Sequence, residues 1–393
     1  MELYHNLLPL PSGYFGASSA LYNLNGLIII YGPAGGAWHI NIEDEPRWYR
    51  NKTKLLGAGL LEMDVILGRD TAFVDRIVEV ASDLKRSFVA ILGTPVSAIT
   101  GIDLKGISKA VQKRLNIPVL YINTIGSEDY CIGAKKAFLE LAKYFVDREY
   151  ITENKTINIL GAIHLDIGRS SHLNPMLELI QQCNFQIKSI WGIDSCISKI
   201  KNCAGAELNI VLTSSGLSVA KWMYNQFNVP YILGFPVGKR AVEKFKRILE
   251  GKYNYSNLTK TSKIDKKVLI VGEPVISYSI KTFLKKELGL KDVIVLSRTP
   301  IDELFSAEGV IYSFLEKGGE DIYTSVESEI SKVINQDEID IVIADPYYRI
   351  LIKNKKIFIP LPHIAVSARF YWDSSYEFIG LTGGEYLKQY FCN

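Results

Sequence analysis

Short, almost wholly apolar runs alternate with amphipathic segments along this 393-residue chain, and this alternation constrains the fold more than any other feature. The runs are Leu27–Ile30, Phe88–Leu92, Val119–Ile122, Ile157–Leu160, Ile187–Ile190, Leu208–Leu212, Val268–Val271, Val293–Leu296 and Ile339–Ile343. Near-continuous apolar runs of this length are typical of strands that are covered on both faces. Strands that alternate with helices predict parallel sheets.

The segments between these runs carry helical periodicity. Thr71–Lys85, Leu104–Leu115 and Gly133–Phe145 each gather apolar residues on one face, the pattern of a helix that packs on a core. Each predicted helix separates two predicted strands, as a parallel crossover requires.

Two polar stretches without strand character, 147–155 and 251–267, interrupt the alternation and read as linkers. They divide the chain into 1–150, 151–255 and 256–393, consistent with about 150 residues per domain. Each piece holds a few strands with helices. The predicted fold class is therefore α/β, with three doubly wound lobes built on parallel sheets.

Charge and cysteine content narrow the classes of partner. The formal net charge of +3 is too small to predict nucleic-acid or membrane-surface binding. The longest apolar run near the N-terminus is far shorter than the roughly 20 residues of a membrane helix. The five cysteines, in a long chain without a recognisable signal peptide, predict free thiols and a cytoplasmic protein.

Familiar ligand motifs are missing. No G-x-x-x-x-G-K-[ST] loop occurs, and no G-x-G-x-x-G follows a predicted strand, so direct binding of ATP or NAD is not expected. Cys196 and Cys203 are separated by six residues, which is outside the usual structural zinc spacing.

Several loops nevertheless occur in a distinctive order: SGYFGA at 12–17, GPAGG at 32–36, EMDVILG at 62–68 and TPVSAITGIDL at 94–104. They resemble the N-terminal lobe of the nitrogenase component 1 type oxidoreductases. That family includes the MoFe-protein subunits, the protochlorophyllide reductase subunits and nitrogenase-like tetrapyrrole reductases. The similarity continues through 209–214, 229–238, 283–289 and 340–346, so it covers nearly the whole chain and implies the three-lobed fold of the family.

The resemblance also shows where this chain departs from the family. Family members hold an iron–sulfur cluster between two subunits with cysteines at positions that here are Ser12, Gly36 and Pro95, or Thr94 if that loop is shifted by one. Glycine and proline side chains cannot bind iron, and serine is a poor substitute for a soft thiolate. The cysteine that binds the nitrogenase active-site cofactor corresponds to Thr213, so dinitrogen reduction is disfavoured.

Three further residues are candidates for chemistry. Cys131 lies at the start of a predicted helix, in a loop that the family places near the cluster, and could supply one ligand to a [4Fe-4S] cluster shared with a partner; a thiol that packs in the core is the alternative. His363 and Arg369, with Thr213, are candidate substrate-binding residues, because Arg suits a carboxylated tetrapyrrole. Packing at a surface or interface would use the same residues.

Two functions follow from these expectations. In the first, the chain is the cluster-poor half of a component 1-like oxidoreductase, paired with a paralogous subunit or with itself as a dimer or heterotetramer. An ATP-dependent iron protein would supply its electrons, and the substrate would not be dinitrogen. In the second, a noncatalytic scaffold or ligand-binding protein retains the fold without a metal. The sequence leaves open the substrate, the presence of any cluster and whether the chain is catalytic.

Overall fold

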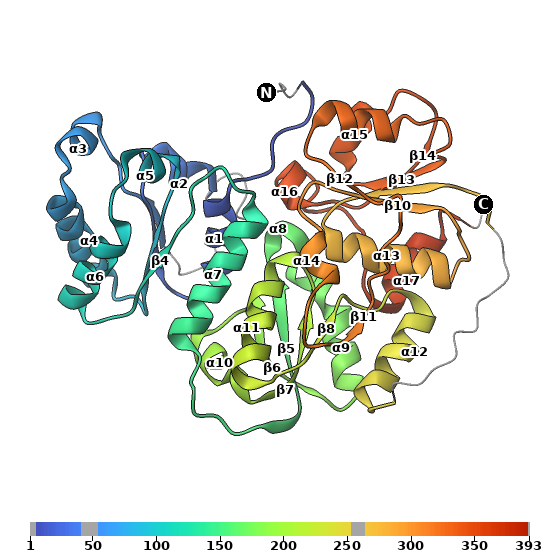
Figure 1. Cartoon of the computed structure of the whole chain (residues 1–393), viewed down its shortest axis with the longest axis horizontal. Coiled ribbons are helices and arrows are strands. Elements are labelled where there is room, and N and C mark those ends of the chain that lie inside the picture. The colour runs from blue at the N-terminus through green and yellow to red at the C-terminus, as the bar shows by residue number, and fades with distance from the viewer. Residues whose placement is uncertain (1–4, 41–53, 253–263, 392–393) are drawn as a thin grey trace.

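The computed structural model describes residues 5–40, 54–252 and 264–391. Three parallel sheets lie side by side along the long axis of the molecule, with helices between them (Figure 1). The predicted fold class is confirmed. No helix in the described ranges has both the length and the apolar character needed to cross a membrane.

The first sheet has the order β2-β1-β3-β4. Its strands are β1 (Leu27–Ile30), β2 (Lys54–Gly57), β3 (Val89–Leu92) and β4 (Val119–Ile122). From β1 the chain crosses to one side to form β2, and β3 then lies on the other side of β1. This reversal is a topological switch point, the position where loops at the strand ends part and leave a crevice.

The other two sheets repeat this arrangement. The middle sheet has the order β11-β8-β7-β5-β6, and the third has the order β12-β10-β9-β13-β14. Their strands are β5 (Glu153–Ala162), β6 (Gln186–Gly192), β7 (Ala206–Val211), β8 (Tyr231–Leu233), β9 (Val268–Val271), β10 (Val293–Ser297), β11 (Val310–Ser313), β12 (Ile322–Tyr323), β13 (Ile341–Ala344) and β14 (Ile357–Pro360). The switch points lie between β5 and β7 and between β9 and β13.

The helices of the first lobe are α1 (Gly13–Leu21), α2 (Gly35–His39), α3 (Glu62–Leu67), α4 (Asp70–Leu84), α5 (Pro95–Thr100), α6 (Leu104–Leu115) and α7 (Tyr130–Phe145). Those of the rest of the chain are α8 (His164–Ile167), α9 (Asn174–Gln182), α10 (Ile197–Lys201), α11 (Leu217–Phe227), α12 (Gly238–Leu249), α13 (Pro274–Lys286), α14 (Asp302–Phe305), α15 (Glu327–Ile334), α16 (Ile364–Ser367) and α17 (Gly380–Lys388). Short 3-10 turns lie between several of them.

Helix layers join the sheets into one body. The buried side chains of α1, α7 and α11 form one cluster with inward-facing residues of the first and middle sheets. A second cluster joins the middle and third sheets through α9, α12, α13 and α17. Apolar burial contributes about 25 cal/mol per Å² removed from water, so these shared clusters hold the lobes together.

The expected divisions 1–150, 151–255 and 256–393 each contain most of one sheet, but one strand is exchanged. β11 lies in the third range and pairs in parallel with β8, which makes it the edge of the middle sheet. Covering the edge of β8 in this way removes a row of unpaired backbone groups. Most of the second expected linker falls on residues 253–263, which lie outside the described residues.

Helices α1 and α7 approach each other more closely than side chains would allow. A Cβ placed on Gly133 would lie 1.7 Å from the carbonyl oxygen of Gly13, and one on Gly16 would lie 1.8 Å from that of Tyr130. Only glycine fits at these positions. This contact places the loop that precedes α1 against the start of α7.

Candidate functional site

The loops that match the family's cluster-binding loops meet at the C-terminal edge of the first sheet. The Thr94 hydroxyl donates to the Tyr31 carbonyl at 2.5 Å, which joins the loops after β1 and β3. The Thr124 hydroxyl donates to the Gly93 carbonyl at 2.6 Å, which joins the loops after β3 and β4. Because parallel strands end at the same edge, loops distant in sequence converge there.

The three cluster-ligand positions share this edge but have little ligand chemistry. Ser12 precedes α1 and forms a single β-bridge with Asp129, and its buried Oγ has no hydrogen-bond partner among the described residues. Gly36 lies in α2 and Pro95 begins α5. One hydroxyl and two residues without donor atoms do not fit an iron–sulfur cluster held by this chain alone. The described ranges also contain no cluster of three His, Cys, Asp or Glu side chains placed to hold a metal ion.

Cys131 is the second residue of α7 and is only 2% exposed. Burial, with smaller contributions from neighbouring carboxylates, raises the pKa of this thiol to about 12, although Lys135 opposes the shift. At neutral pH the side chain is therefore a thiol, whereas a metal ligand must be a thiolate. Cys183, Cys196 and Cys203 are also free thiols, as predicted, and Cys392 lies outside the described residues.

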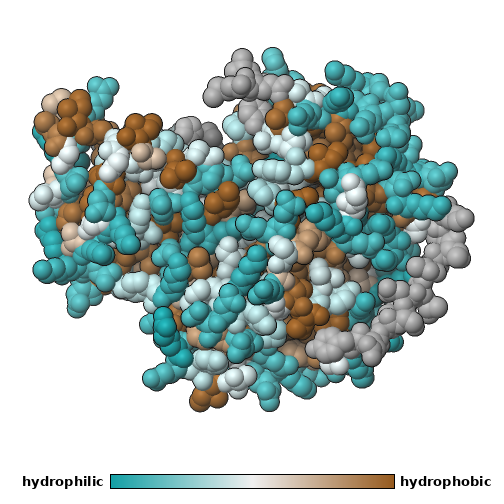
Figure 2. All heavy atoms as spheres, viewed as in Figure 1, coloured by the Kyte–Doolittle hydropathy of each residue, from teal (hydrophilic) through white to brown (hydrophobic). Residues whose placement is uncertain are grey.

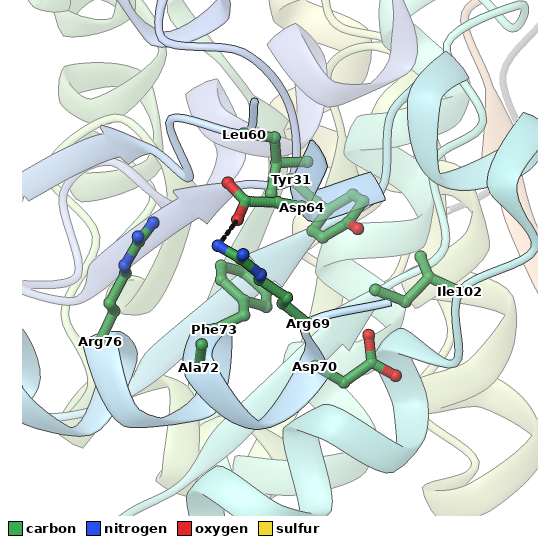
Figure 3. A pocket seen from close by; sticks show the side chains of 9 residues that line it. All are labelled: Tyr31, Leu60, Asp64, Arg69, Asp70, Ala72, Phe73, Arg76 and Ile102. Atoms are coloured by element: carbon green, nitrogen blue, oxygen red, sulfur yellow. Dashed lines mark hydrogen bonds and ion pairs between the residues drawn. The ribbon is translucent and has the colours of Figure 1, made fainter. Parts of the chain in front are cut away.

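A small pocket opens beside the switch point of the first sheet (Figure 3). The ring of Tyr31 packs edge-on against Phe73, with 5.3 Å between ring centroids, and Arg69 reaches across to the Asp64 carboxylate at 3.3 Å. The cavity is about 20 Å³, which is room for roughly one water molecule. An organic substrate does not fit in this pocket.

A second concentration of polar groups lies where the three lobes meet. Tyr130, at the start of α7, donates its hydroxyl to Asp166 Oδ1 at 2.6 Å. His363 Nε2 lies 3.2 Å from each of those two oxygen atoms. Each lobe supplies one member, because Asp166 lies in α8 of the middle lobe and His363 immediately precedes α16 of the third. We call this set the three-lobe junction.

The junction is buried and incompletely satisfied. The side chain of Asp166 is 0% exposed and that of His363 is 10% exposed. Asp166 Oδ2 and His363 Nδ1 are buried with no hydrogen-bond partner among the described residues. Unsatisfied polar atoms in a protein interior are costly, so they mark a place where a ligand, a water molecule or a proton has a role.

Asp345, directly after β13, holds His363 in place. Its Oδ2 accepts the backbone N–H of His363 at 2.8 Å and the Ser367 hydroxyl at 2.7 Å, and its Oδ1 accepts the backbone N–H of Tyr347 at 2.8 Å. Burial raises the pKa of Asp345, although these donors and His363 oppose the shift. The carboxylate therefore fixes the loop that carries His363.

Glu273 joins the switch points of the middle and third sheets. Its carboxyl accepts the backbone N–H of Ser214, after β7, at 2.7 Å and that of Ile276, in α13, at 2.9 Å. Burial and then the negative charge of Asp166 raise its pKa to about 8, despite these two donors. Glu273 is therefore mostly protonated at neutral pH and stores a proton beside Asp166.

The N-terminal segment covers the junction. Leu10 lines a cavity of about 10 Å³ together with Tyr130, Glu273, Arg298 and His363. Arg298 donates to the Leu8 carbonyl at 3.1 Å, which ties the segment to the third lobe. A cavity of this size is comparable to a single water molecule, so the junction is closed in this structure.

The structure brings together only part of the predicted substrate-binding set. His363 lines the junction cavity. Thr213 is fully buried, and its hydroxyl donates to the Gly161 carbonyl at 2.6 Å, so it closes the turn after β7. Arg369 lies in the turn after α16 and does not line the junction cavity.

The sequence reasoning missed Tyr130, Asp166, Glu273, Arg298 and Asp345. A usable signal was present, because Asp166, Glu273 and Asp345 each follow a strand that borders a switch point: β5, β9 and β13. Acidic side chains at such strand ends are good candidates for a site.

Three doubly wound lobes whose strand-end loops meet at an edge and at a shared junction define the three-lobed class of protein to which nitrogenase component 1 belongs. The comparisons agree. The model of the nitrogenase component 1 type oxidoreductase family matches residues 12–263, and the chain belongs to that family.

Relatives and solved structures place the chain more closely. It is 23% identical over 356 residues to the nitrogenase iron-molybdenum cofactor biosynthesis protein NifE of Nostoc sp., covering 80% of this chain and 70% of that protein. It is 30% identical over 138 residues to one of the proteins that form the light-independent protochlorophyllide reductase of Chaetosphaeridium globosum, covering 33% of this chain and only 27% of that protein. A solved structure described as nitrogenase Cp1 at pH 6.5 has a TM-score of 0.76 and 16% identity, covering 100% of this chain and 93% of that one, which shows the shared fold.

Proposed function

We propose that this chain is a subunit of a component 1-like oxidoreductase that reduces a substrate other than dinitrogen. A paralogous subunit would supply the thiolates that Ser12, Gly36 and Pro95 do not, and an ATP-dependent iron protein would supply electrons. The observation that carries the proposal is an exposed apolar surface around the degenerate loops. A cytoplasmic location suits free thiols and such partners.

This surface, which we call the first-lobe apolar face, lies on segments that follow strands of the first sheet (Figure 2). Its members and exposed fractions are Trp38 54%, Leu61 69%, Met63 54%, Ile66 74%, Leu67 56% and Ile99 85%. Exposed apolar patches of this kind mark protein–protein interfaces. Their position beside the converging loops favours a partner that completes the same site.

The junction is the proposed location of acid–base chemistry. Tyr130, Asp166, Glu273 and His363 are close enough to share protons, and Glu273 holds one at neutral pH because burial raises its pKa to about 8. Carboxyl groups outnumber cations there, which favours proton donation over binding of an anion. The proposal that His363 and Arg369 bind a substrate carboxylate therefore has weaker support than an acid–base role for His363.

The test is anaerobic purification of the chain, alone and co-expressed with a paralogous partner from the same genome, with measurement of iron and sulfide. We expect iron only in the co-purified complex. Ile66→Lys should abolish co-purification, whereas the control Ile151→Lys, at a residue that is 83% exposed outside the first-lobe apolar face, should not.

A noncatalytic scaffold or ligand-binding protein is the second candidate function. The donor-poor residues at Ser12, Gly36 and Pro95 favour it, and the NifE relative is named as a cofactor biosynthesis protein. Absence of iron both from the chain alone and from the co-purified complex would support this function and contradict the first.

A further inference from the structure

A cavity that takes no part in the junction lies between the middle and third lobes. It is bounded by α12, α13 and the end of β11, three elements that come together because β11 is exchanged into the middle sheet (Figure 1). Its volume is about 210 Å³. An apolar cavity of roughly 150 Å³ holds benzene, so this one has room for a small two-ring aromatic molecule.

The interior of the cavity is apolar. Val237, Phe283 and Phe314 line it and are each at most 2% exposed, while Tyr312 and Leu315 form partly buried walls. Aromatic rings favour edge-to-face and offset packing with another ring, beyond the area that they bury. The lining therefore suits a flat apolar body.

The mouth of the cavity is cationic. Arg240 and Lys244 lie one turn apart on α12 and both line it. The Lys244 Nζ lies 4.7 Å from the ring centroid of Tyr312, which places this ammonium directly above the aromatic wall. A charged group next to a buried apolar floor is the usual arrangement for orienting an amphipathic ligand.

The two acidic residues of the lining are already neutralised. Glu316 contacts Lys285 at 3.2 Å and Lys286 at 3.1 Å. Glu287 contacts Lys388 at 3.0 Å and accepts the backbone N–H of Arg240 at 3.0 Å. Cations around the mouth therefore exceed carboxylates, and the surplus favours an anion.

We propose that this cavity binds a small aromatic carboxylate, with its ring system against Phe283 and Phe314 and its carboxylate at Lys244 and Arg240. Lys244 supplies a charge-assisted contact at the mouth, and the guanidinium of Arg240 suits the planar carboxylate. None of the junction residues lines this cavity, so the site is separate from the proposed acid–base centre.

The test is isothermal titration of the full chain with 2-naphthoate, with 2-naphthalenemethanol and octanoate as comparison ligands. We expect saturable binding of 2-naphthoate and much weaker binding of the other two. Lys244→Gln should raise the Kd about tenfold, because it removes a hydrogen bond to a charged group. Ala241→Phe should abolish binding, because the new ring fills the cavity.

The matched control is Lys246→Gln on the same helix. Lys246 does not line the cavity and donates to Gln182 at 3.2 Å, so its substitution should leave the Kd unchanged. Thermal unfolding of every variant checks that it is folded. The proposal is overturned if wild-type protein shows no saturable binding, or if Lys244→Gln and Ala241→Phe bind like wild type. Equal affinity for the alcohol would overturn the carboxylate, and equal affinity for octanoate the aromatic body.

Discussion

The edge of the first sheet and the three-lobe junction are built by the same device and have opposite character. Both lie at the strand ends beside topological switch points. The first edge presents Ser12, Gly36 and Pro95 beside an exposed apolar face, whereas the junction buries Tyr130 with Asp166 and other ionisable groups. The difference teaches that one topology can yield an incomplete surface that needs a partner and a closed interior that handles protons.

The two regions also differ in what a substitution should cost. Exposed apolar side chains contribute little to the stability of the isolated chain, because nothing covers them. Each carboxylate of the junction satisfies several donors, so its loss leaves those donors buried and unpaired. Mutations should therefore separate the regions by their effect on folding.

The largest effect is expected at the joint between the regions, where α1 meets α7. Gly133→Val would place atoms within 1.7 Å of the Gly13 carbonyl, so the helices cannot approach. We expect a loss of at least about 4 kcal/mol in the free energy of unfolding, or no folded protein. Urea unfolding followed by circular dichroism measures it. Gly35→Ala, where a Cβ meets nothing within 4 Å, is the control and should not destabilise the chain.

Loss of the carboxylate that positions His363 should come next. Asp345→Ala leaves the backbone N–H groups of Tyr347 and His363 and the Ser367 hydroxyl without their acceptor, at a cost of about 3 kcal/mol. Asp373→Ala removes a carboxylate that is 92% exposed and pairs with Arg169, and should change stability by less than about 0.5 kcal/mol. Equal urea midpoints for the two variants would contradict this account of the junction.

The junction should also make stability depend on pH. The pKa of Glu273 is raised from 4.5 to about 8, mainly by burial, so the folded state retains a proton that the unfolded chain releases. Its contribution is present below about pH 4.5 and is lost as pH rises toward 8. Glu273→Gln should flatten the fall in urea midpoint between pH 5 and 8, and an unchanged slope would be evidence against this role.

A smaller effect is expected at Cys131. Because burial keeps this side chain a thiol, Cys131→Ser should cost about 1–2 kcal/mol through the buried hydroxyl and should leave the iron content of a co-purified complex unchanged. Elemental analysis of the complex measures it. Loss of iron in this variant alone would instead establish Cys131 as a ligand.

The smallest effect on folding is expected on the first-lobe apolar face. Ile66→Lys should change the free energy of unfolding of the isolated chain by less than about 0.5 kcal/mol, since Ile66 is 74% exposed. Its effect should be confined to association with a partner. A large loss of stability in the isolated chain would mean that this face is covered within the fold.

Much of the fold was predictable because local patterns carry it. The runs Leu27–Ile30, Val119–Ile122 and Val268–Val271 coincide with β1, β4 and β9, and Leu104–Leu115 coincides with α6. Strands β2, β8, β11 and β12 were missed. They are short, and β2, β11 and β12 are also partly exposed, so they lack a continuous apolar signal.

The candidate site was predicted far less well. His363 was named and lines the junction, but its partner Asp166 is separated from it by 197 positions. Glu273 and Asp345 follow strands in a way that the sequence displays, yet nothing local shows that their loops face one another. Thr213 was expected to bind substrate and instead closes a turn, because its hydroxyl is used by the Gly161 carbonyl.

The sequence by itself determined the alternation of strands and helices, the three parallel sheets and the loss of thiolates at Ser12, Gly36 and Pro95, since apolar periodicity and residue chemistry act locally. Only the tertiary structure decided that β11 joins the middle sheet, that Tyr130, Asp166 and His363 meet, and that burial raises the pKa of Glu273. The physical reason is that proximity and desolvation depend on the packing of whole lobes, which no local pattern encodes.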